Sequence, residues 1–188
     1  MGNSDVLNLF RESGALLEGH FKLSSGLHST GYLQCALVLQ DATRAETLGR
    51  MLGELLNAYS ATAVLSPAIG GLIIGHEVGR ALGVKAIFAE RQDKVLTLRR
   101  GFSLSPADRV VIIEDVVTTG LSTRETIEVA KAAGATVVAA GSIIDRSGQQ
   151  ALGVPYHALA TLVLPTYQPD ACPLCASGSP VTKPGSRG

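Results

Sequence analysis

The segment from Val110 to Thr123, with the sequence VVIIEDVVTTGLST, constrains the fold more than any other part of the chain. Its first four residues are all β-branched, which is typical of a strand covered on both faces. Two acids follow, and then a small polar loop that opens onto a helical pattern. A strand that leads directly into a helix is half of a βαβ unit. We therefore expect 110–113 to be the central strand of a parallel sheet.

Helical and strand patterns alternate between residues 41 and 165, which indicates the α/β class with a parallel sheet flanked by helices. Capping boxes are predicted for Thr43 with Glu46 and for Ser122 with Glu125, each at the start of a helix. The expected elements are a helix over 42–59, a strand over 63–66, a helix over 72–82 that ends at Gly83, a strand over 84–89, a helix from 122 that ends at Gly134, and a strand over 136–144.

Length and charge favour one globular domain with site-specific binding. The chain has 188 residues, of which 46% are hydrophobic, and its 16 basic residues balance its 16 acidic ones. No overall positive field favours nucleic acid or membrane. The sequence has no apolar run of membrane-spanning length, no signal-like start, and an odd number of cysteines, so we expect a cytoplasmic protein in a reducing compartment.

The polar half of the 110–123 segment has the chemistry of a phosphate cradle. Thr118, Thr119, Ser122 and Thr123 offer hydroxyl donors, and Gly120 allows the backbone to approach a ligand closely. The helix start adds free N–H groups and the positive end of its dipole. The neighbouring acids, at residues 114 and 115, would repel each other unless hydroxyls or a metal matched them. Ribose hydroxyls and Mg²⁺ meet both needs.

This segment resembles the phosphoribosyl pyrophosphate (PRPP) signature of the type I phosphoribosyltransferases. The alternative is a strand–turn–helix corner with exposed acids; a Walker P-loop is excluded because the Gly-Lys-Ser/Thr ending is missing. The resemblance implies that PRPP binds to residues Glu114, Asp115, Val116, Val117, Thr118, Thr119, Gly120, Leu121 and Ser122.

Three further segments resemble the orotate phosphoribosyltransferases within that family. The first, Gly19–Tyr32, is similar to the family's N-terminal hood, which covers the base; by itself it could be a polar turn. The resemblance implies that Phe21 and Ser24 contact orotate, although many relatives have a lysine at the position of Ser24. It also implies one phosphoribosyltransferase domain, in which residues 1–40 help to form the hood, 41–165 form the α/β core and 166–188 form a Pro/Gly-rich tail that we expect to be irregular.

The second and third segments are similar to a pyrophosphate loop and a mobile catalytic loop. Ser66–Gly71 resembles the pyrophosphate loop and implies that Gly70 and Gly71 bind PRPP through their backbone, whereas a plain helix start is the alternative. Residues 88–102 are similar to a loop that closes over the active site of a neighbouring subunit, or else form a solvated surface hairpin. The resemblance assigns catalytic and PRPP-binding roles to Arg91 and Lys94, and a catalytic role to Asp115.

Arg146 lies just after the predicted strand 136–144, at a position similar to the family's base-recognition site. An arginine can grip a carboxylate with two parallel hydrogen bonds, which suits orotate and no purine base. The alternative is an exposed arginine that pairs with Asp145. The resemblance implies that Arg146 and Thr118 contact orotate.

The implied function is transfer of ribose 5-phosphate from PRPP to orotate, which gives orotidine 5′-monophosphate and pyrophosphate in pyrimidine biosynthesis. Mg²⁺ is the implied cofactor, held mainly through the substrate, and the implied assembly is a homodimer with shared active sites. A phosphoribosyltransferase for another base, or a PRPP-sensing regulator with this fold, stays open as the alternative.

Cys172 and Cys175 form a C-x-x-C pair, which is half of a typical zinc site. No second pair is present, and the four histidines show no metal-ligand spacing. We therefore expect a structural turn with no nearby histidine, with a metal shared between two subunits as the alternative.

Overall fold

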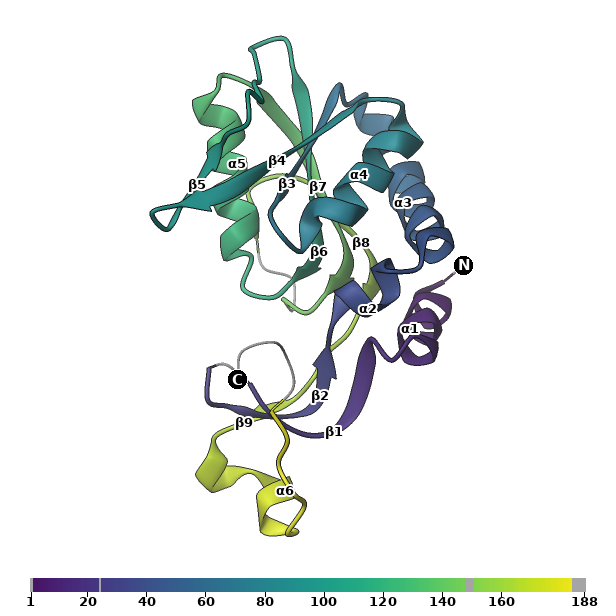
Figure 1. Ribbon diagram of the computed structural model, residues 1–188, viewed down its shortest axis with the longest axis vertical. Coiled ribbons are helices and arrows are strands. Elements are labelled where there is room, and N and C mark those ends of the chain that lie inside the picture. The colour runs from purple at the N-terminus through teal and green to yellow at the C-terminus, as the bar shows by residue number, and fades with distance from the viewer. Residues whose placement is uncertain (1, 24, 148–150, 184–188) are drawn as a thin grey trace.

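The computed structural model describes residues 2–23, 25–147 and 151–183. Its main sheet has the strand order β5-β4-β3-β6-β7-β8, in which only β5 runs antiparallel to its neighbour (Figure 1). The strands are β3 (Ala63–Pro67), β4 (Lys85–Gln92), β5 (Val95–Leu98), β6 (Arg109–Val117), β7 (Thr136–Asp145) and β8 (Tyr156–Thr161). The predicted α/β class and the interior position of the strand that contains 110–113 are confirmed.

Helices cover both faces of this sheet. The helices α1 (Asn3–Glu12), α3 (Ala42–Leu56) and α4 (Gly71–Leu82) pack on one face, and α5 (Leu121–Ala132) packs on the other. A 3-10 turn, η1 (Asn57–Tyr59), extends α3 to the end of its predicted range. Gly83 ends α4 in the left-handed conformation, as predicted. None of the described helices is long and apolar enough to cross a membrane.

Both predicted capping boxes are wrong. The helix α3 is capped by Asp41, whose carboxylate accepts hydrogen bonds from the backbone N–H groups of Thr43 and Arg44. The helix α5 has Gly120 as its N-cap, with φ of 70°, so Ser122 lies inside the first turn rather than before it. In each case the helix begins one or more residues before the predicted cap.

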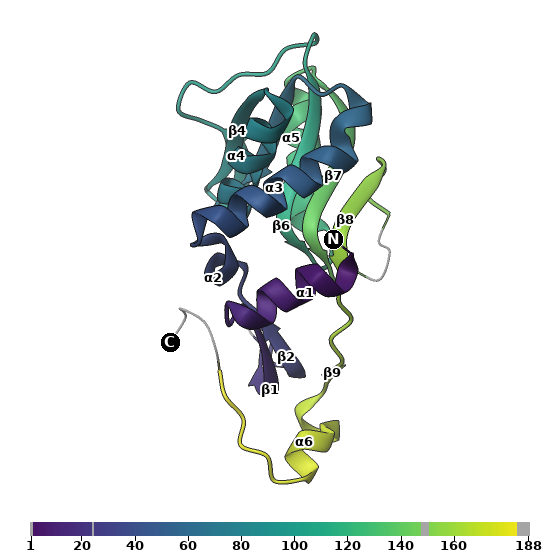
Figure 2. The same ribbon diagram turned by 90° about the vertical axis from the view of Figure 1, so that its right-hand side faces the viewer.

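A second, smaller sheet lies beyond the carboxyl ends of the main strands (Figures 1 and 2). We call it the hood sheet; it consists of β1 (Leu16–Lys22), β2 (His28–Leu33) and β9 (Thr166–Tyr167). The short helix α2 (Cys35–Leu39) connects it to α3. Because β9 comes from the other end of the chain, residues 166–167 complete the sheet that residues 16–33 begin.

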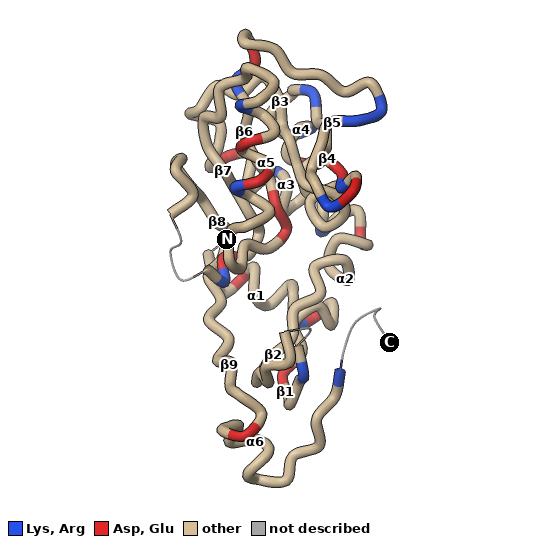
Figure 3. The backbone as a smooth tube through the Cα atoms, turned by 90° about the vertical axis from the view of Figure 1, so that its left-hand side faces the viewer, with Lys and Arg blue, Asp and Glu red and all other residues tan. Residues whose placement is uncertain are grey.

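The segment after β9 is more regular than predicted. It forms a 3-10 turn, η2 (Pro169–Ala171), and a short helix, α6 (Pro173–Ala176), and then returns to β1 through an isolated bridge between Phe21 and Thr182. The expectation of an irregular tail is therefore wrong for these parts. Residues of both charge signs are interspersed along the backbone (Figure 3), in keeping with the balanced composition.

Candidate active site

Three groups of predicted site residues are brought to one edge of the main sheet by its topology. The strands β3, β6 and β7 are parallel neighbours, so their carboxyl ends lie at the same edge. Three segments begin there: the 66–71 loop after β3, the 114–123 segment at the end of β6, and Arg146 after β7. This edge faces the hood sheet (Figure 1). Ligands of open α/β sheets bind at such an edge.

The loop between β6 and α5 encloses a small polar hollow of about 50 Å³. Gly120 adopts a left-handed conformation, and a side chain there would collide with Leu152 and Arg124. The start of α5 directs its first backbone N–H groups toward this loop, and that of Leu121 donates to Thr119 Oγ1 at 3.4 Å. The hollow is lined by Glu114, Val116, Val117, Thr118, Thr119, Gly120, Leu121, Ser122 and Thr123.

The 66–71 loop lies directly against Asp115, one of the two neighbouring acids. A Cβ atom added to Gly70 would lie 2.8 Å from Asp115 Oδ1, and one added to Gly71 would lie 2.8 Å from the carbonyl oxygen of Ile113. The peptide bond between Ala68 and Ile69 is cis. Ser66 Oγ is buried and has no hydrogen-bond partner among the described residues. The 66–71 loop thus lies against Asp115, whereas Glu114 lines the hollow of the loop between β6 and α5.

Burial disfavours the charge on both carboxylates of the acidic pair. It raises the pKa of Glu114 to about 8, and the neighbouring charge of Asp115 adds to the rise. Burial also raises the pKa of Asp115, although a hydrogen bond from the backbone N–H of Val116, at 2.8 Å, works against the rise. Two buried carboxylates that accept few hydrogen bonds would be stabilised in their charged form by a ligand that brings hydroxyl groups or a cation.

Arg146 is half-buried near this pair, and its Nε atom is buried without a hydrogen-bond partner among the described residues. Its backbone N–H donates to the carbonyl of Val117 at 2.8 Å, which fixes it beside the end of β6. Burial lowers the pKa of this guanidinium. An arginine with a buried and unused N–H group is well suited to an incoming anion.

Cys35 is a site residue that sequence reasoning missed. Burial raises the pKa of its thiol, and Asp115 adds to the rise through its charge and a hydrogen bond, whereas the charge of Arg146 lowers it. The thiol therefore lies between the predicted PRPP-binding and orotate-binding residues. A lone cysteine at the start of a five-residue helix gives no sequence signal for such a position.

The basic hairpin is present, as β4 and β5 with a turn at Asp93 and Lys94. The guanidinium of Arg91 donates to the carbonyl of Lys94 at 2.6 Å and to the carboxylate of Glu125, on α5, at 2.5 Å. Lys94 lies at the rim of a groove of about 500 Å³ between the hairpin and α5. The structure therefore places Arg91 and Lys94, the predicted catalytic cations, next to α5. The guanidinium of Arg91 already has hydrogen-bond partners in this position.

The hood residues are only partly described. Phe21 is buried in β1, and its ring centroid lies 6.1 Å from that of Tyr32. Ser24 lies outside the described residues. The aromatic pair gives the hood an apolar wall.

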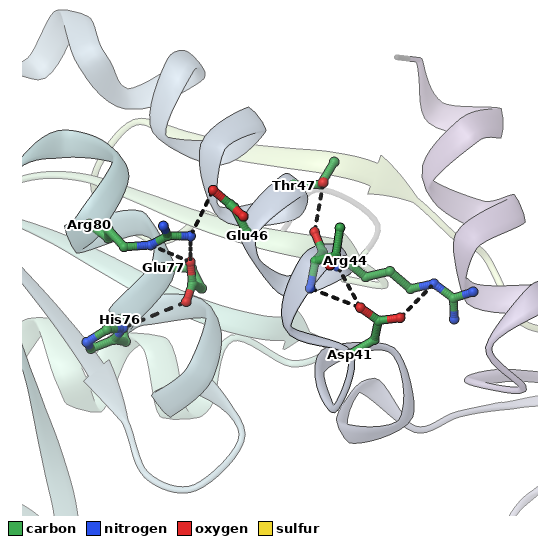
Figure 4. Close-up of polar contacts among 8 residues, drawn as sticks. Asp41, Arg44, Glu46, Thr47, His76, Glu77 and Arg80 are labelled. Carbon is green, nitrogen blue, oxygen red and sulfur yellow. Dashed lines mark hydrogen bonds and ion pairs between the residues drawn. The ribbon is translucent and has the colours of Figure 1, made fainter.

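A second groove, of about 460 Å³, lies along α3 and α4 and does not contain any predicted site residue. Its charged groups are largely paired: Arg80 bonds to Glu77 at 2.6 Å and lies 3.3 Å from Glu46 (Figure 4). His76 Nδ1 lies 3.8 Å from Glu77. This internal pairing leaves the groove little unsatisfied charge with which to recognise a phosphorylated substrate.

The expectation that no histidine lies near Cys172 and Cys175 is wrong. His20 and His28, on β1 and β2 of the hood sheet, lie beside both cysteines, and one ligand atom from each residue falls within 4.8 Å of the others. The prediction failed because the histidines and cysteines are far apart in the sequence and only the fold brings them together.

The comparisons with known proteins agree with this geometry. No model of a protein family matches the sequence. The chain is 52% identical over 186 residues to the orotate phosphoribosyltransferase of Carboxydothermus hydrogenoformans, with 97% of each chain covered. It is also similar to the crystal structure of the Aeropyrum pernix orotate phosphoribosyltransferase, with a TM-score of 0.71, 29% identity, and coverage of 84% of this chain and 93% of that one. The Mycobacterium tuberculosis orotate phosphoribosyltransferase, in a structure with PRPP, shares the fold with a TM-score of 0.67, 20% identity, and coverage of 85% and 96%.

Proposed function

The chain belongs to the orotate phosphoribosyltransferase family, and from that premise we propose that the edge formed by β3, β6 and β7 is its active site. The enzyme transfers ribose 5-phosphate from PRPP to orotate, which gives orotidine 5′-monophosphate and pyrophosphate. The observation that carries the site assignment is the convergence of the 66–71 loop, the acidic pair and Arg146 at one sheet edge. The name shared by the relatives favours orotate over the other bases that the sequence left open.

PRPP is held by two helix starts on either side of the acidic pair. Residues 118–122, at the start of α5, bind the 5-phosphate through hydroxyl and backbone N–H groups. Glu114 and Asp115 accept hydrogen bonds from the ribose hydroxyls, while Val116, Val117 and Leu121 shape the hollow around them. Gly70 and Gly71, at the start of α4, bind the pyrophosphate with backbone N–H groups.

The donor set fits Mg²⁺ held mainly through the substrate. Glu114 and Asp115 are buried acids with raised pKa values, next to a loop where a single Cβ atom would fill the space. Oxygen ligands of this kind suit a hard divalent cation. When bound, Mg²⁺ supplies positive charge against the pyrophosphate that leaves.

Orotate is oriented by Arg146. Its unpaired Nε–H and a terminal N–H can grip the orotate carboxylate with two parallel bonds, which a lysine cannot do. From the family resemblance, we also assign contacts with the base to Thr118 and to the hood residues Phe21 and Ser24. Uracil and the purine bases offer no carboxylate to this guanidinium.

The reaction is a displacement at the anomeric carbon of the ribose. A ring nitrogen of orotate bonds to that carbon while the bond to the pyrophosphate oxygen breaks, and positive charge develops on the sugar between them. Asp115, on the ribose side, favours that charge. Arg91 and Lys94 bind the pyrophosphate when the hairpin closes, which requires Arg91 to leave Glu125. Closure also keeps water from the reactive carbon.

The active enzyme is a homodimer in which the hairpin of one subunit serves the site of the other. The proposal of a homodimer comes from the family resemblance. We also propose a cytoplasmic location, because the odd cysteine count suits a reducing compartment. Mixing Lys94→Ala and Asp115→Asn subunits tests the sharing, because each hybrid dimer regains one intact site and the mixture should recover about a quarter of wild-type activity. Recovery of no activity by a mixture in which hybrid dimers are demonstrated would contradict shared sites.

A transfer assay with a panel of bases tests the function. The protein is incubated with PRPP and Mg²⁺ and with orotate, uracil, adenine or hypoxanthine, and nucleotide formation is measured. We expect turnover with orotate and none with the other three. Turnover of a purine would overturn the assignment, and PRPP binding without turnover of any base would favour the regulator.

A further inference from the structure

Four potential metal ligands converge at the far side of the hood sheet, away from the main sheet. His20 belongs to β1 and His28 begins β2, whereas Cys172 precedes α6 and Cys175 lies within it. The views in Figures 1 and 2 agree that α6 lies at the end of the molecule beyond the hood sheet. The cluster thus joins the first part of the chain to its last described part.

Three of the distances within the cluster are close to those of a tetrahedral site, and all four ligand atoms lie within 4.8 Å of one another. His20 Nε2 lies 3.5 Å from Cys172 Sγ and 3.7 Å from Cys175 Sγ, and His28 Nδ1 lies 3.3 Å from Cys175 Sγ. Ligand atoms bound to one tetrahedral zinc ion at about 2.1–2.3 Å lie roughly 3.3–3.8 Å apart. His20 Nε2 and His28 Nδ1 are nearer, at 2.8 Å, so the two rings need to separate by about half an ångström around an ion.

A hydrogen bond outside the cluster prepares His20 as a ligand. His20 Nδ1 lies 2.8 Å from the carbonyl oxygen of Ser179. A carbonyl can only accept, so Nδ1 carries the proton, and Nε2, which lies 2.8 Å from His28 Nδ1, is left as the nitrogen that can bind an ion. This is the arrangement by which backbone carbonyls orient metal-bound histidines.

Three of the four residues of the cluster are buried, and backbone hydrogen bonds hold the turn that carries the cysteines. His20, His28 and Cys172 are 4%, 6% and 3% exposed, and Cys175 is exposed at the outer edge. The Cys-Pro-Leu-Cys turn is held by bonds from the N–H of Ala176 to the carbonyl of Cys172 and from the N–H of Gly178 to the carbonyl of Cys175. Both sides of the cluster therefore have a fixed backbone.

We propose that His20, His28, Cys172 and Cys175 bind one Zn²⁺ ion in a Cys₂His₂ site that fastens the 168–182 segment to the hood sheet. Two thiolates and two imidazoles in a tetrahedral arrangement select zinc over the hard cations that carboxylates prefer. Four protein ligands leave no position open for a substrate, so the ion is structural. Binding releases the two thiol protons to solvent.

The role of such an ion is to keep the 168–182 segment attached to the hood sheet. Without the ion, the segment after β9 is tied to β1 mainly by Thr182. The backbone N–H of Thr182 donates to the carbonyl of His20 at 2.9 Å, and its carbonyl accepts a hydrogen bond from the backbone N–H of Lys22 at 2.8 Å. His20 directly precedes Phe21 in β1. An ion bound to His20 would therefore be held next to the residue that forms part of the aromatic wall of the hood. This site is separate from the Mg²⁺ proposed above, and its detection does not depend on orotate transfer.

Metal analysis of the purified full chain tests the proposal. We expect one zinc ion per chain by mass spectrometry of the elements, and near-complete loss in Cys175→Ser and in His28→Asn. Cys35→Ser and His76→Asn are matched controls, since each removes a residue of the same type outside the cluster, and both should keep the metal. Equal loss in the controls, or wild-type protein without zinc, would overturn the proposal.

Two measurements on the wild-type chain remain decisive even if the variants fold poorly. Removal of the metal with a chelator should lower the melting temperature, and Co²⁺ added to the metal-free protein should saturate at one equivalent with the visible absorption of a tetrahedral thiolate complex. A disulfide between Cys172 and Cys175 in protein purified without oxidant, or a Co²⁺ titration that never saturates, would contradict the site.

Discussion

Gly70 lies so close to Asp115 that a Cβ atom on residue 70 would come within 2.8 Å of the carboxylate oxygen Oδ1. The loop before α4 therefore packs directly against one of the two acids at the end of β6. Because this contact joins neighbouring parallel strands, it places the proposed pyrophosphate-binding and ribose-binding groups side by side.

Gly70→Ala should impair catalysis more than stability. Its φ of −56° suits alanine, so the backbone is not strained, but the new methyl group would displace the Asp115 carboxylate. A displacement of about 1 Å in an active site can lower the rate by roughly 100-fold. Steady-state kinetics should show a loss of kcat/KM for PRPP with a nearly unchanged melting temperature. Gly2→Ala, with nothing within 4 Å, is the control, and wild-type kinetics for Gly70→Ala would refute the proposed contact.

Arg146→Lys should raise the KM for orotate. The substitution keeps a positive charge but removes the paired N–H groups, and a charged hydrogen bond contributes about 1.5–3 kcal/mol. We therefore expect a rise of roughly 10-fold to 100-fold, with the KM for PRPP little changed. Arg50→Lys is a suitable control because Arg50 is an exposed partner of Glu54 on α3. An unaffected orotate KM would remove Arg146 from the base site.

PRPP affinity should rise with pH. The pKa of Glu114 is raised to about 8 in the free enzyme, so the carboxyl is largely protonated at neutral pH. Ribose hydroxyls donate to the ionised form, so binding should release a proton. The Kd should fall by up to about tenfold per pH unit as the pH rises from about 7 to 8, and then level off.

Calorimetry in buffers with different ionisation enthalpies measures that proton release. Glu114→Gln cannot titrate and should give a flatter pH profile for the Kd. A wild-type Kd that is constant or rises over this pH range would contradict the assignment of Glu114 to ribose binding.

Asp108→Asn should destabilise the fold. The carboxylate of Asp108 accepts bonds from Lys85 Nζ at 2.8 Å and from the N–H and hydroxyl of Ser105, and these lower its pKa to about 2. Since the folded pKa is depressed from 3.8, this stability is fully present above that pH and is lost as the pH falls through about 2. Because Lys85 is half-exposed, we expect a loss of about 1–2 kcal/mol at pH 7.

Denaturant unfolding at pH 7 and at acidic pH checks this prediction. The exposed Glu12→Gln is the control and should unfold like the wild type. An Asp108→Asn deficit in the free energy of unfolding that does not shrink in acid would show that the charge of Asp108 is not its cause.

The core fold and the position of the 110–123 segment at the sheet edge could be predicted because their signals are local. The β-branched run, the acids, Gly120 and the helix start all lie within 110–123, and the strand-to-helix order fixes their place at the sheet edge. Helix caps were harder to place, because Asp41 competes with Thr43 and only the backbone geometry decides between them.

Features that depend on distant residues could not be predicted. The thiol of Cys35 reaches Asp115 only because α2 connects the hood sheet to the core. Similarly, His20 meets Cys175 only because β9 pairs with β2 and leads the end of the chain back past the hood. Neither contact has a characteristic spacing in the sequence.

A crystal structure with PRPP, Mg²⁺ and orotate, or a non-reacting analogue of orotate, shows whether the proposed site is the active site. We expect the 5-phosphate at residues 118–122, the ribose hydroxyls on Glu114 and Asp115, and the orotate carboxylate on Arg146. Ligand density in the groove between α3 and α4, or an orotate carboxylate far from Arg146, would contradict this assignment.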